Sequence, residues 1–496
     1  MQLIYGIKDK PKFSQRLVFA LQQVLAIMAA TLAVPAVINN SMKELGIVTD
    51  MSPAAALCGA GIGTVIYLLF TRSKSPVFLG SSFAFIDSMC SAFAGAATVS
   101  LGYLGLILGA VLAGLVYVVL AIFAKTLGTD WLNRLMPPVV IGPTVAIIGL
   151  SLAPNAIADL LKSGVTEQVM QYSIELKSGI PTIVENLVDT ATGSVHVCLV
   201  CGLITLLTTV LFATFGKKMS RLIPFILGIL AGYASACVFY LIGDLVGNDM
   251  LKVISFEPFV RCFSPVSLSS FFSVPGFTFL RAKGAFSELN AGYFITLLTA
   301  YVPVAFVVFA EHIADHKNLS TIVEKDLLKD PGLHRTLLGD GVGSMAGAFF
   351  GGCPNTTYGE SIGCVAITGN ASIVTIWYAA ALCILISFLS PFIAFLESIP
   401  SCVMGGVCIA LYGFIAVSGL KMLQQVDLNE TRNLFTASVI LITGVGGLSV
   451  SFAIGTGTVT LTTVACALIL GIVTNLMVRK GATPAGEEPK PQQLIK

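Results

Sequence analysis

Long runs of apolar residues dominate this chain and limit what it can fold into. A membrane-spanning helix needs about 20 mostly apolar residues, and candidates begin near residues 17, 54, 103, 137, 194, 222, 292, 372, 401, 433 and 456. Only 11% of the residues are charged, against about 25% in soluble domains, and the mean hydropathy is +0.90. The sequence therefore predicts an all-α polytopic membrane protein.

Three further stretches, at 76–90, 336–351 and 356–370, are shorter or rich in glycine. Counting them gives fourteen transmembrane segments. In that arrangement most of the 28 Lys and Arg residues fall on one side, in the N-terminal tail, the turns at 71–75 and 217–221, and the loop at 314–335. Cytoplasmic loops carry such an excess of positive charge. We therefore expect a plasma-membrane protein with both termini in the cytoplasm and no cleaved signal peptide.

The two halves of the chain resemble one another. The string SSFA at 81–84 resembles TTYG at 356–359, and PPVVIG at 137–142 resembles PSCVMG at 400–405, although chance can also produce such short matches. Because each half holds seven spans, an odd number, the halves would be inverted in the membrane. The predicted parts are a tail (1–16), a first repeat (17–247), an extracellular loop (248–291), a second repeat (292–478) and a C-terminal tail (479–496). The outer loops near 154–192 and 245–290 are predicted to hold amphipathic surface helices.

Two segments at matching places in the halves are poor continuous helices. LGSSFAFIDS and CPNTTYGESIG are rich in Ser, Thr, Asn and Gly, which favour caps and turns, and Pro354 blocks a helix before it. Non-helical backbone at membrane depth is tolerated only inside protein or beside a wet cavity. We expect SSFAF and TTYG to be short extended strands that pair, each followed by a half-helix whose N-terminus points to a polar solute.

Several carboxylates fall inside apolar segments, where charge is costly and usually functional. They are Asp87, Glu311, Asp340, Glu360 and Glu397. Glu311 and Glu360 are the strongest candidates for binding a solute and a proton. The other three have structural alternatives, namely a helix cap for Asp87, an internal hydrogen bond for Asp340 and an interfacial charge for Glu397.

Other classes of protein find little support in the residues. The chain has only four His, none in a metal-binding spacing, so a metal enzyme is not expected and no metal or organic cofactor is predicted. Cys198 and Cys201 form a CxxC pair, but inside an apolar span, where small buried residues are the plainer interpretation. No basic stripe indicates nucleic acid. Paired central carboxylates would repel an anion, which disfavours an anion exchanger. They suit a carrier that binds and releases its solute better than they suit an open channel.

The segments AEHIADH, GGCPNTTYGESIG and MGGVCIALYGFIAVSG resemble the nucleobase–ascorbate transporter family, also called nucleobase:cation symporter-2, and within it the bacterial uracil permeases. The family signature is matched by Glu360, Ser361, Gly363, Thr368 and Gly369. The resemblance spans nearly the whole chain. It implies fourteen spans in two inverted seven-span repeats, short antiparallel strands in spans three and ten, a core domain and a gate domain. It also allows a homodimer through the gate domain.

The resemblance also implies a substrate site. Glu311 would hydrogen-bond the base, and Glu360 would contribute at the start of a half-helix. The remaining substrate residues implied by the motif positions are Ser82, Phe83, Tyr358, Gly359 and Tyr412. Proton coupling would involve Glu311, Asp315 and Glu360.

Three positions depart from the family pattern. Gln23 and Asp315 stand where the family often has histidine, and Ser361 stands where it often has asparagine. Coupling would then rest on Glu311, with Asp315 four residues later on the same helix face. The expected function is uracil–proton symport by alternating access, with a purine (xanthine or urate) permease of the same family as the alternative.

Overall fold

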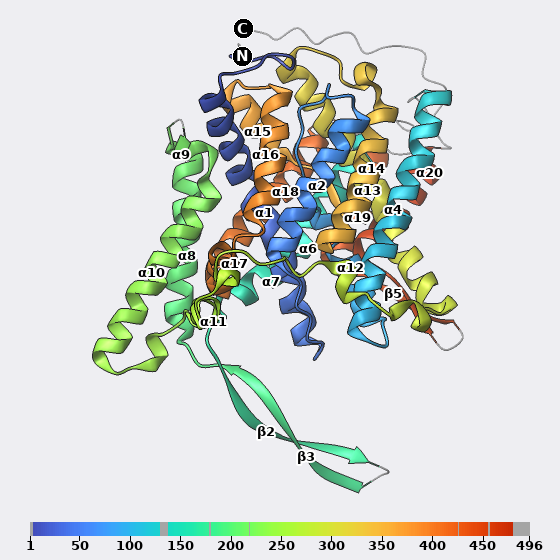
Figure 1. Cartoon of the computed structure of the whole chain (residues 1–496). Helices are drawn as coiled ribbons and strands as arrows, with labels where there is room; N and C mark the ends of the chain where they lie inside the picture. The colour runs from blue at the N-terminus through green and yellow to red at the C-terminus, as the bar shows by residue number, and fades with distance from the viewer. Residues whose placement is uncertain are drawn as a thin grey trace.

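A computed structural model describes residues 3–128, 137–177, 180–217, 219–424, 426–454 and 457–479, and most of them are helical (Figure 1). The helices are α1 (Phe13–Glu44), α2 (Pro53–Phe70), α3 (Ile86–Ala94), α4 (Val99–Leu127), α6 (Pro138–Ser151), α7 (Ala153–Leu160), α8 (Val195–Phe215), α9 (Met219–Leu222), α10 (Pro224–Val246), α11 (Glu257–Phe263), α12 (Thr278–Arg281), α13 (Ala291–Val323), α14 (Leu333–Gly351), α15 (Gly359–Thr368), α16 (Ile373–Ile386), α17 (Ser390–Ser398), α18 (Ser401–Leu423), α19 (Thr431–Val445) and α20 (Thr463–Arg479). The strands are β1 (Leu79–Ser81), β2 (Thr166–Lys177), β3 (Ile180–Ala191), β4 (Asn355–Thr357), β5 (Val450–Ile454) and β6 (Gly457–Leu461).

Within the described ranges, eight helical segments are long and apolar enough to cross a membrane: α1, α2, α4, α6 with α7, α8, α10, α13 and α18. Four shorter apolar helical segments accompany them, at Phe83–Ala94, Ile373–Ile386, Thr431–Val445 and Thr463–Val478. The chain is therefore a multi-pass membrane protein, as its composition predicts. The first helix begins at Phe13, a few residues before the predicted start, because Gln15 Oε1 accepts from the Lys12 N–H at 3.2 Å and completes a polar first turn ahead of the apolar run.

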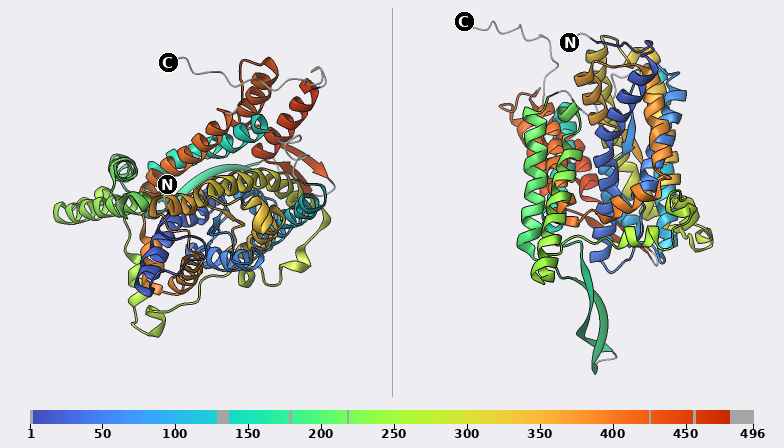
Figure 2. Two further views of the ribbon diagram at one scale, coloured as in Figure 1. Left: turned by 90° about the horizontal axis from the view of Figure 1, so that it is seen from above. Right: turned by 60° about the vertical axis from the view of Figure 1, so that its left-hand side comes forward.

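The helices form two groups that lie side by side (Figure 2). In one group α2 packs against α14 and α16, α4 packs against α13 and α14, and α15 packs against α1 and α13. In the other group α18 packs against α6, α7 and α8, α10 packs against α8, and α19 packs against α6 and α20. We call these the α2–α14 group and the α6–α18 group. The groups meet where α13 approaches α6 and α20, and where α1 approaches α10 and α18.

Glycines bring α2 and α14 into backbone contact. Gly59 faces Gly347, and Gly63 faces Gly343, so closely that a Cβ at either α2 position would overlap a backbone carbonyl of α14. Small residues at four-residue spacing allow this close approach between membrane helices. On its other side α14 packs against α4. These contacts explain how a helix with several glycines and one aspartate can lie within an apolar bundle.

The two interrupted segments meet as a pair of short strands. β1 and β4 are antiparallel, with Leu79 opposite Thr357 and Ser81 opposite Asn355. The expectation that SSFAF is an extended strand is wrong in part, because Phe83–Phe85 is one turn of 3₁₀-helix. Ser82 is the last extended residue, and Phe83 already begins the helical path that leads into α3.

The outer loops differ from their prediction. The range 154–192 begins in α7, but most of it is an antiparallel hairpin of β2 and β3, which projects away from the helices (Figure 1). Surface helices are therefore the wrong expectation for 166–191. Tyr172, Ile174 and Leu176 alternate with polar residues, a period of two that is typical of strands. The loop at 245–290 does contain short helices, α11 and α12 among them. A second hairpin, β5–β6, precedes α20, which starts at Thr463 and not near residue 456.

Candidate functional site

Residues around Glu360 are placed by the sharp end of α14. Gly352 adopts a left-handed conformation (φ 77°) that caps α14, and Pro354 follows it, so the chain leaves the helix and enters β4. Tyr358 is extended and is the N-cap of α15. Glu360 consequently lies in the first turn of α15, where the helix dipole favours negative charge.

A small cavity of about 40 Å³ lies at the junction of the strands, α13 and α15. It brings together six of the predicted substrate residues and four others, and its lining is Ser82, Phe83, Ala84, Ile148, Glu311, Thr356, Tyr358, Gly359, Glu360 and Ile415. The seventh predicted residue, Tyr412 of α18, is buried and meets the Phe83 ring edge-on, with centroids 5.7 Å apart. Ile148 and Ile415 come from the α6–α18 group, so the cavity lies between the two groups.

A larger cavity of about 460 Å³ shares Glu311, Gly359, Glu360 and Ile415 with the small one. It extends along α13 past Asp315 to Asn318, toward the pole of the molecule at which residues 3–9 lie (Figure 1). Its other wall comes from the α6–α18 group and consists of Val145, Phe414, Ile415, Ser418, Lys421 and Met422. A volume of about 460 Å³ beside the two glutamates is within the range of small-molecule sites.

Three carboxylates face this space from the α2–α14 group. Glu311, Asp315 and Glu360 are all half-buried. In the part of the chain that the structure describes, neither glutamate has an ion-pair partner. Asp315 accepts a hydrogen bond from Thr357 Oγ1 at 2.7 Å, which ties α13 to β4. Sequence reasoning missed this partner, although Thr357 belongs to the hydroxyl pair that marks the interrupted segment.

Hydrogen bonds from three elements fix the start of α15. Ser361 Oγ accepts from the Phe78 backbone N–H at 3.1 Å, and the Ser361 carbonyl accepts from Gln23 Nε2 at 3.3 Å. The Tyr358 hydroxyl donates to the Ser81 carbonyl at 2.6 Å, and its ring packs on Gly80. Gln23 therefore supports the site from α1, and its polar side chain within an apolar span is the signal that could have identified it. Tyr358 lines the small cavity, but its hydroxyl is already occupied.

The remaining sequence candidates lie apart from these cavities. Asp340 is fully buried and Oδ2 lies 2.7 Å from Nδ1 of His312, which supports its structural interpretation. Asp87 is in the first turn of α3, where no side-chain cap hydrogen bond forms at the N-cap, Phe85. Glu397 is half-exposed and pairs with Arg261 at 3.6 Å, as an interfacial charge would. Cys198 and Cys201 are buried on α8.

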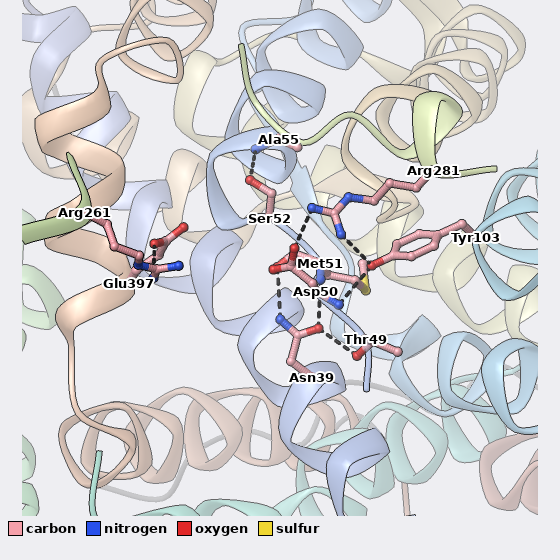
Figure 3. A network of polar contacts seen from close by, with 10 residues as sticks. All are labelled: Asn39, Thr49, Asp50, Met51, Ser52, Ala55, Tyr103, Arg261, Arg281 and Glu397. Carbon is pink, nitrogen blue, oxygen red and sulfur yellow. Dashed lines mark hydrogen bonds and ion pairs between the residues drawn. The ribbon is translucent and has the colours of Figure 1, made fainter. Parts of the chain in front are cut away.

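A cavity of about 590 Å³ occupies the opposite pole, and none of the predicted site residues lines it. Several of its polar groups are already paired (Figure 3). Arg281 Nη2 contacts Asp50 Oδ2 at 2.7 Å, and Nη1 donates to the Tyr103 hydroxyl at 3.3 Å. Asn39 holds the α1–α2 turn by accepting hydrogen bonds from Thr49 Oγ1 and from the Met51 N–H. Glu311, Asp315 and Glu360 therefore line the 460 Å³ cavity and do not line this one.

Comparison with known proteins gives the family. A family model described as "Permease family" matches residues 14–454. The uracil permease of Bacillus subtilis (strain 168) is 36% identical over 478 residues, covering 95% of this chain and 94% of that protein. The uracil permease of Escherichia coli (strain K12) is 32% identical and covers 95% and 93%. These matches confirm the family resemblance, and the relatives are permeases, not enzymes.

Solved structures share the fold at low sequence identity. The transmembrane domain of the cyanobacterial bicarbonate transporter BicA is 12% identical, with a TM-score of 0.57, covering 96% of this chain and 100% of that one. The murine Slc26a9 anion transporter, solved in its inward-facing state, is 12% identical with a TM-score of 0.59, covering 95% and 69%. The likeness concerns the arrangement of the helices alone.

Proposed function

The chain belongs to the permease family, and we propose that it imports uracil together with a proton. The observation that carries this proposal is the meeting of Glu311 and Glu360 in one cavity between the two helix groups. The relatives whose names specify uracil match nearly the whole chain. The function is therefore that of a nucleobase transporter, with uracil as its substrate.

Uracil offers two N–H donors and two carbonyl acceptors on a flat, neutral ring. Glutamates accept from the donors, and the backbone N–H groups of Phe83 and Gly359, which border the small cavity, serve the carbonyls. Phe83 lines the small cavity and offers a ring on which a flat solute can stack, and Tyr412 packs edge-on against Phe83 at 5.7 Å. A site built from such pairs rejects analogues strongly, because its buried polar groups would otherwise be left without partners.

Proton coupling follows from the same carboxylates. Burying an unpaired negative charge costs several kcal/mol, and Glu311 and Glu360 have no ion-pair partner within the described residues. Taking up a proton neutralises the site and lowers the cost of moving it past the α6–α18 group. We assign proton binding to Glu311 together with Glu360. Asp315, one helical turn after Glu311 on the same face of α13, assists in proton coupling.

The architecture that we propose has two inverted seven-segment repeats. The eight long segments, the four shorter apolar ones, α14 and α15 make fourteen. Equivalent segments run antiparallel where they meet. β1 pairs antiparallel with β4. Gly59 and Gly63 of α2 face Gly347 and Gly343 of α14 in reverse order, and Gly142 and Gly149 of α6 face α18 near residues 419 and 412, also in reverse order.

The two helix groups then take the roles of core and gate. The core is the α2–α14 group, which carries the carboxylates, and the gate is the α6–α18 group. With the termini in the cytoplasm of a plasma-membrane protein, the 460 Å³ cavity faces the cytoplasm, and sliding of the core would expose the site at the other pole.

The gate presents exposed apolar side chains on α8 and α10, among them Leu207, Leu211 and Leu241, and we place the homodimer contact there.

The function is tested with purified protein in liposomes. Labelled uracil should accumulate when the outside is acidic, and a protonophore should abolish that accumulation. Unlabelled uracil should compete well, and xanthine or urate should compete poorly. Stronger competition by a purine would replace the substrate assignment, and accumulation that persists without a proton gradient would overturn the coupling.

A further inference from the structure

The first described residues of the chain lie against the connection between α15 and α16. Tyr5 and Asn370 form a parallel β-bridge. The backbone N–H groups of Ile4 and Tyr5 donate to the Gly369 carbonyl at 2.8 and 3.1 Å. The Tyr5 carbonyl accepts from Ala371 N–H at 2.9 Å. We call residues 3–9 the N-terminal strap.

Side chains fasten the strap as well as its backbone. Ile7 is 7% exposed, and its carbonyl accepts from the Ile373 N–H at 3.1 Å. Ser372 Oγ donates to the Asp9 carbonyl at 2.6 Å. Tyr5 donates to Gln15 Oε1 at 3.0 Å, which links the strap to the first turn of α1. The strap therefore joins the beginning of α1 to the end of α15.

The helix that the strap holds is short and carries Glu360 at its other end. α15 has ten residues, a length of about 15 Å at 1.5 Å per residue. Gly369, whose carbonyl accepts from the strap, adopts a left-handed conformation (φ 64°) that ends the helix. A helix of fewer than three turns has little stability of its own, so its position depends on its packing against α1 and α13 and on the contacts that hold its two ends.

The two ends of α15 are held by different parts of the chain. Gln23 and the Phe78 N–H bind Ser361 at the cavity end, and the strap binds the far end. We propose that the N-terminal strap is a positioning element of the substrate site, which keeps Glu360 at the cavity by fixing the C-terminal end of α15. This inference rests on the proposed function, because it assigns Glu360 to substrate binding.

A pair of matched substitutions tests the strap. Ile7→Asp places a charge at a buried position of the strap, whereas Lys8→Asp makes a larger charge change at an exposed neighbour. We expect Ile7→Asp to raise the Kd for uracil in detergent by about tenfold or more, and Lys8→Asp to change it by less than about twofold. The deletion of residues 2–9 should behave as Ile7→Asp does.

Rescue distinguishes positioning from general damage. A synthetic peptide of residues 1–12, added to the deletion variant, should restore uracil binding toward the wild-type value. Wild-type affinity for uracil in both the deletion variant and Ile7→Asp would overturn the proposal. It would also be overturned if the deletion variant eluted in gel filtration as the wild type does and the peptide failed to restore its binding. If the wild-type protein bound no uracil, the proposed function would fail instead. Hydrogen exchange over residues 359–372 would then test the strap alone, and unchanged exchange in the deletion variant would overturn it.

Discussion

Two faces of α13 carry polar groups in opposite circumstances. On one face His312 lies 2.7 Å from Asp340 and 3.0 Å from Thr336, and His316 lies 2.7 Å from the Tyr67 hydroxyl, all of them fully buried. On the other face Glu311, adjacent to His312 in the sequence, lines the cavity and has no ion-pair partner in the described ranges.

The difference separates polar groups that hold the protein together from those kept for a ligand. A buried polar group with its partners in place stabilises the contact between helices and leaves nothing for a solute. A carboxylate that borders a cavity without a partner is costly unless a ligand or a proton completes it. We expect substitutions on the two faces of α13 to change different measured quantities.

The largest effect on transport is expected on the cavity face. Glu311→Gln and Glu360→Gln should each lower uphill uracil accumulation by about a hundredfold or more, because each removes a charged acceptor and a proton site. Uptake into liposomes with a pH gradient measures this. The matched control is Glu397→Gln at the opposite pole, which should retain uptake. Uphill accumulation in a Glu311→Gln protein would exclude that residue from the coupling.

Substitutions on the inner face should lower stability more than transport. Asp340→Ala removes the partner of His312 and should cost about 1–3 kcal/mol of unfolding free energy, seen as a lower thermal midpoint in detergent. Uracil uptake per folded molecule should stay within a few-fold of the wild type. A fully stable Asp340→Ala protein with no uptake would contradict the division between the two faces of α13.

Asp315 links the two situations, because it faces the cavity and yet has a partner in Thr357. Thr357→Val removes the donor to Asp315 and should raise the KM for uracil by about tenfold, since hydrogen bonds to charged groups contribute about 1.5–3 kcal/mol. Thr357→Ser keeps the hydroxyl and should restore the KM. Equal KM values for the Val and Ser variants would show that this hydrogen bond does not support the site.

The smallest effect is expected at the opposite pole. The Arg261–Glu397 pair is 3.6 Å long, with side chains 66% and 46% exposed, and exposed pairs contribute about 0–1 kcal/mol. Arg261→Ala should therefore change neither the thermal midpoint nor the uptake rate by a measurable amount. A large loss of uptake would indicate that the cavity at this pole takes part in transport.

The membrane spans and the place of the interruptions could be predicted from the sequence, because both depend on local chemistry. Apolar runs give the spans, and the Ser, Thr, Gly and Pro residues around 81–84 and 354–359 exclude a continuous helix there. The exact strand ends could not be predicted, because pairing with the other half decides that Leu79–Ser81 is extended and Phe83 is not.

Contacts between distant segments could not be predicted from the sequence, for a similar reason. The cavity residues Ile148 and Ile415 look like any other apolar residues until α6 and α18 are packed beside α13. Pairing of His312 with Asp340 depends on how α13 and α14 are rotated, and the bridge from Tyr5 to Asn370 joins residues 365 positions apart. The β2–β3 hairpin did leave a signal, in the alternation of Tyr172, Ile174 and Leu176 with polar residues.

The glycine contact between α2 and α14 bears on how the protein is made. An isolated segment with the composition of α14, several glycines and Asp340, has too little apolar surface to enter a bilayer alone. Its neighbours α2 and α4 precede it in the chain and offer it a backbone surface that lipid does not. During synthesis, residues 333–351 should therefore enter the bilayer only by packing against α2 and α4, which are made earlier. Replacing Gly59 or Gly63 by a larger residue should first prevent the insertion of α14.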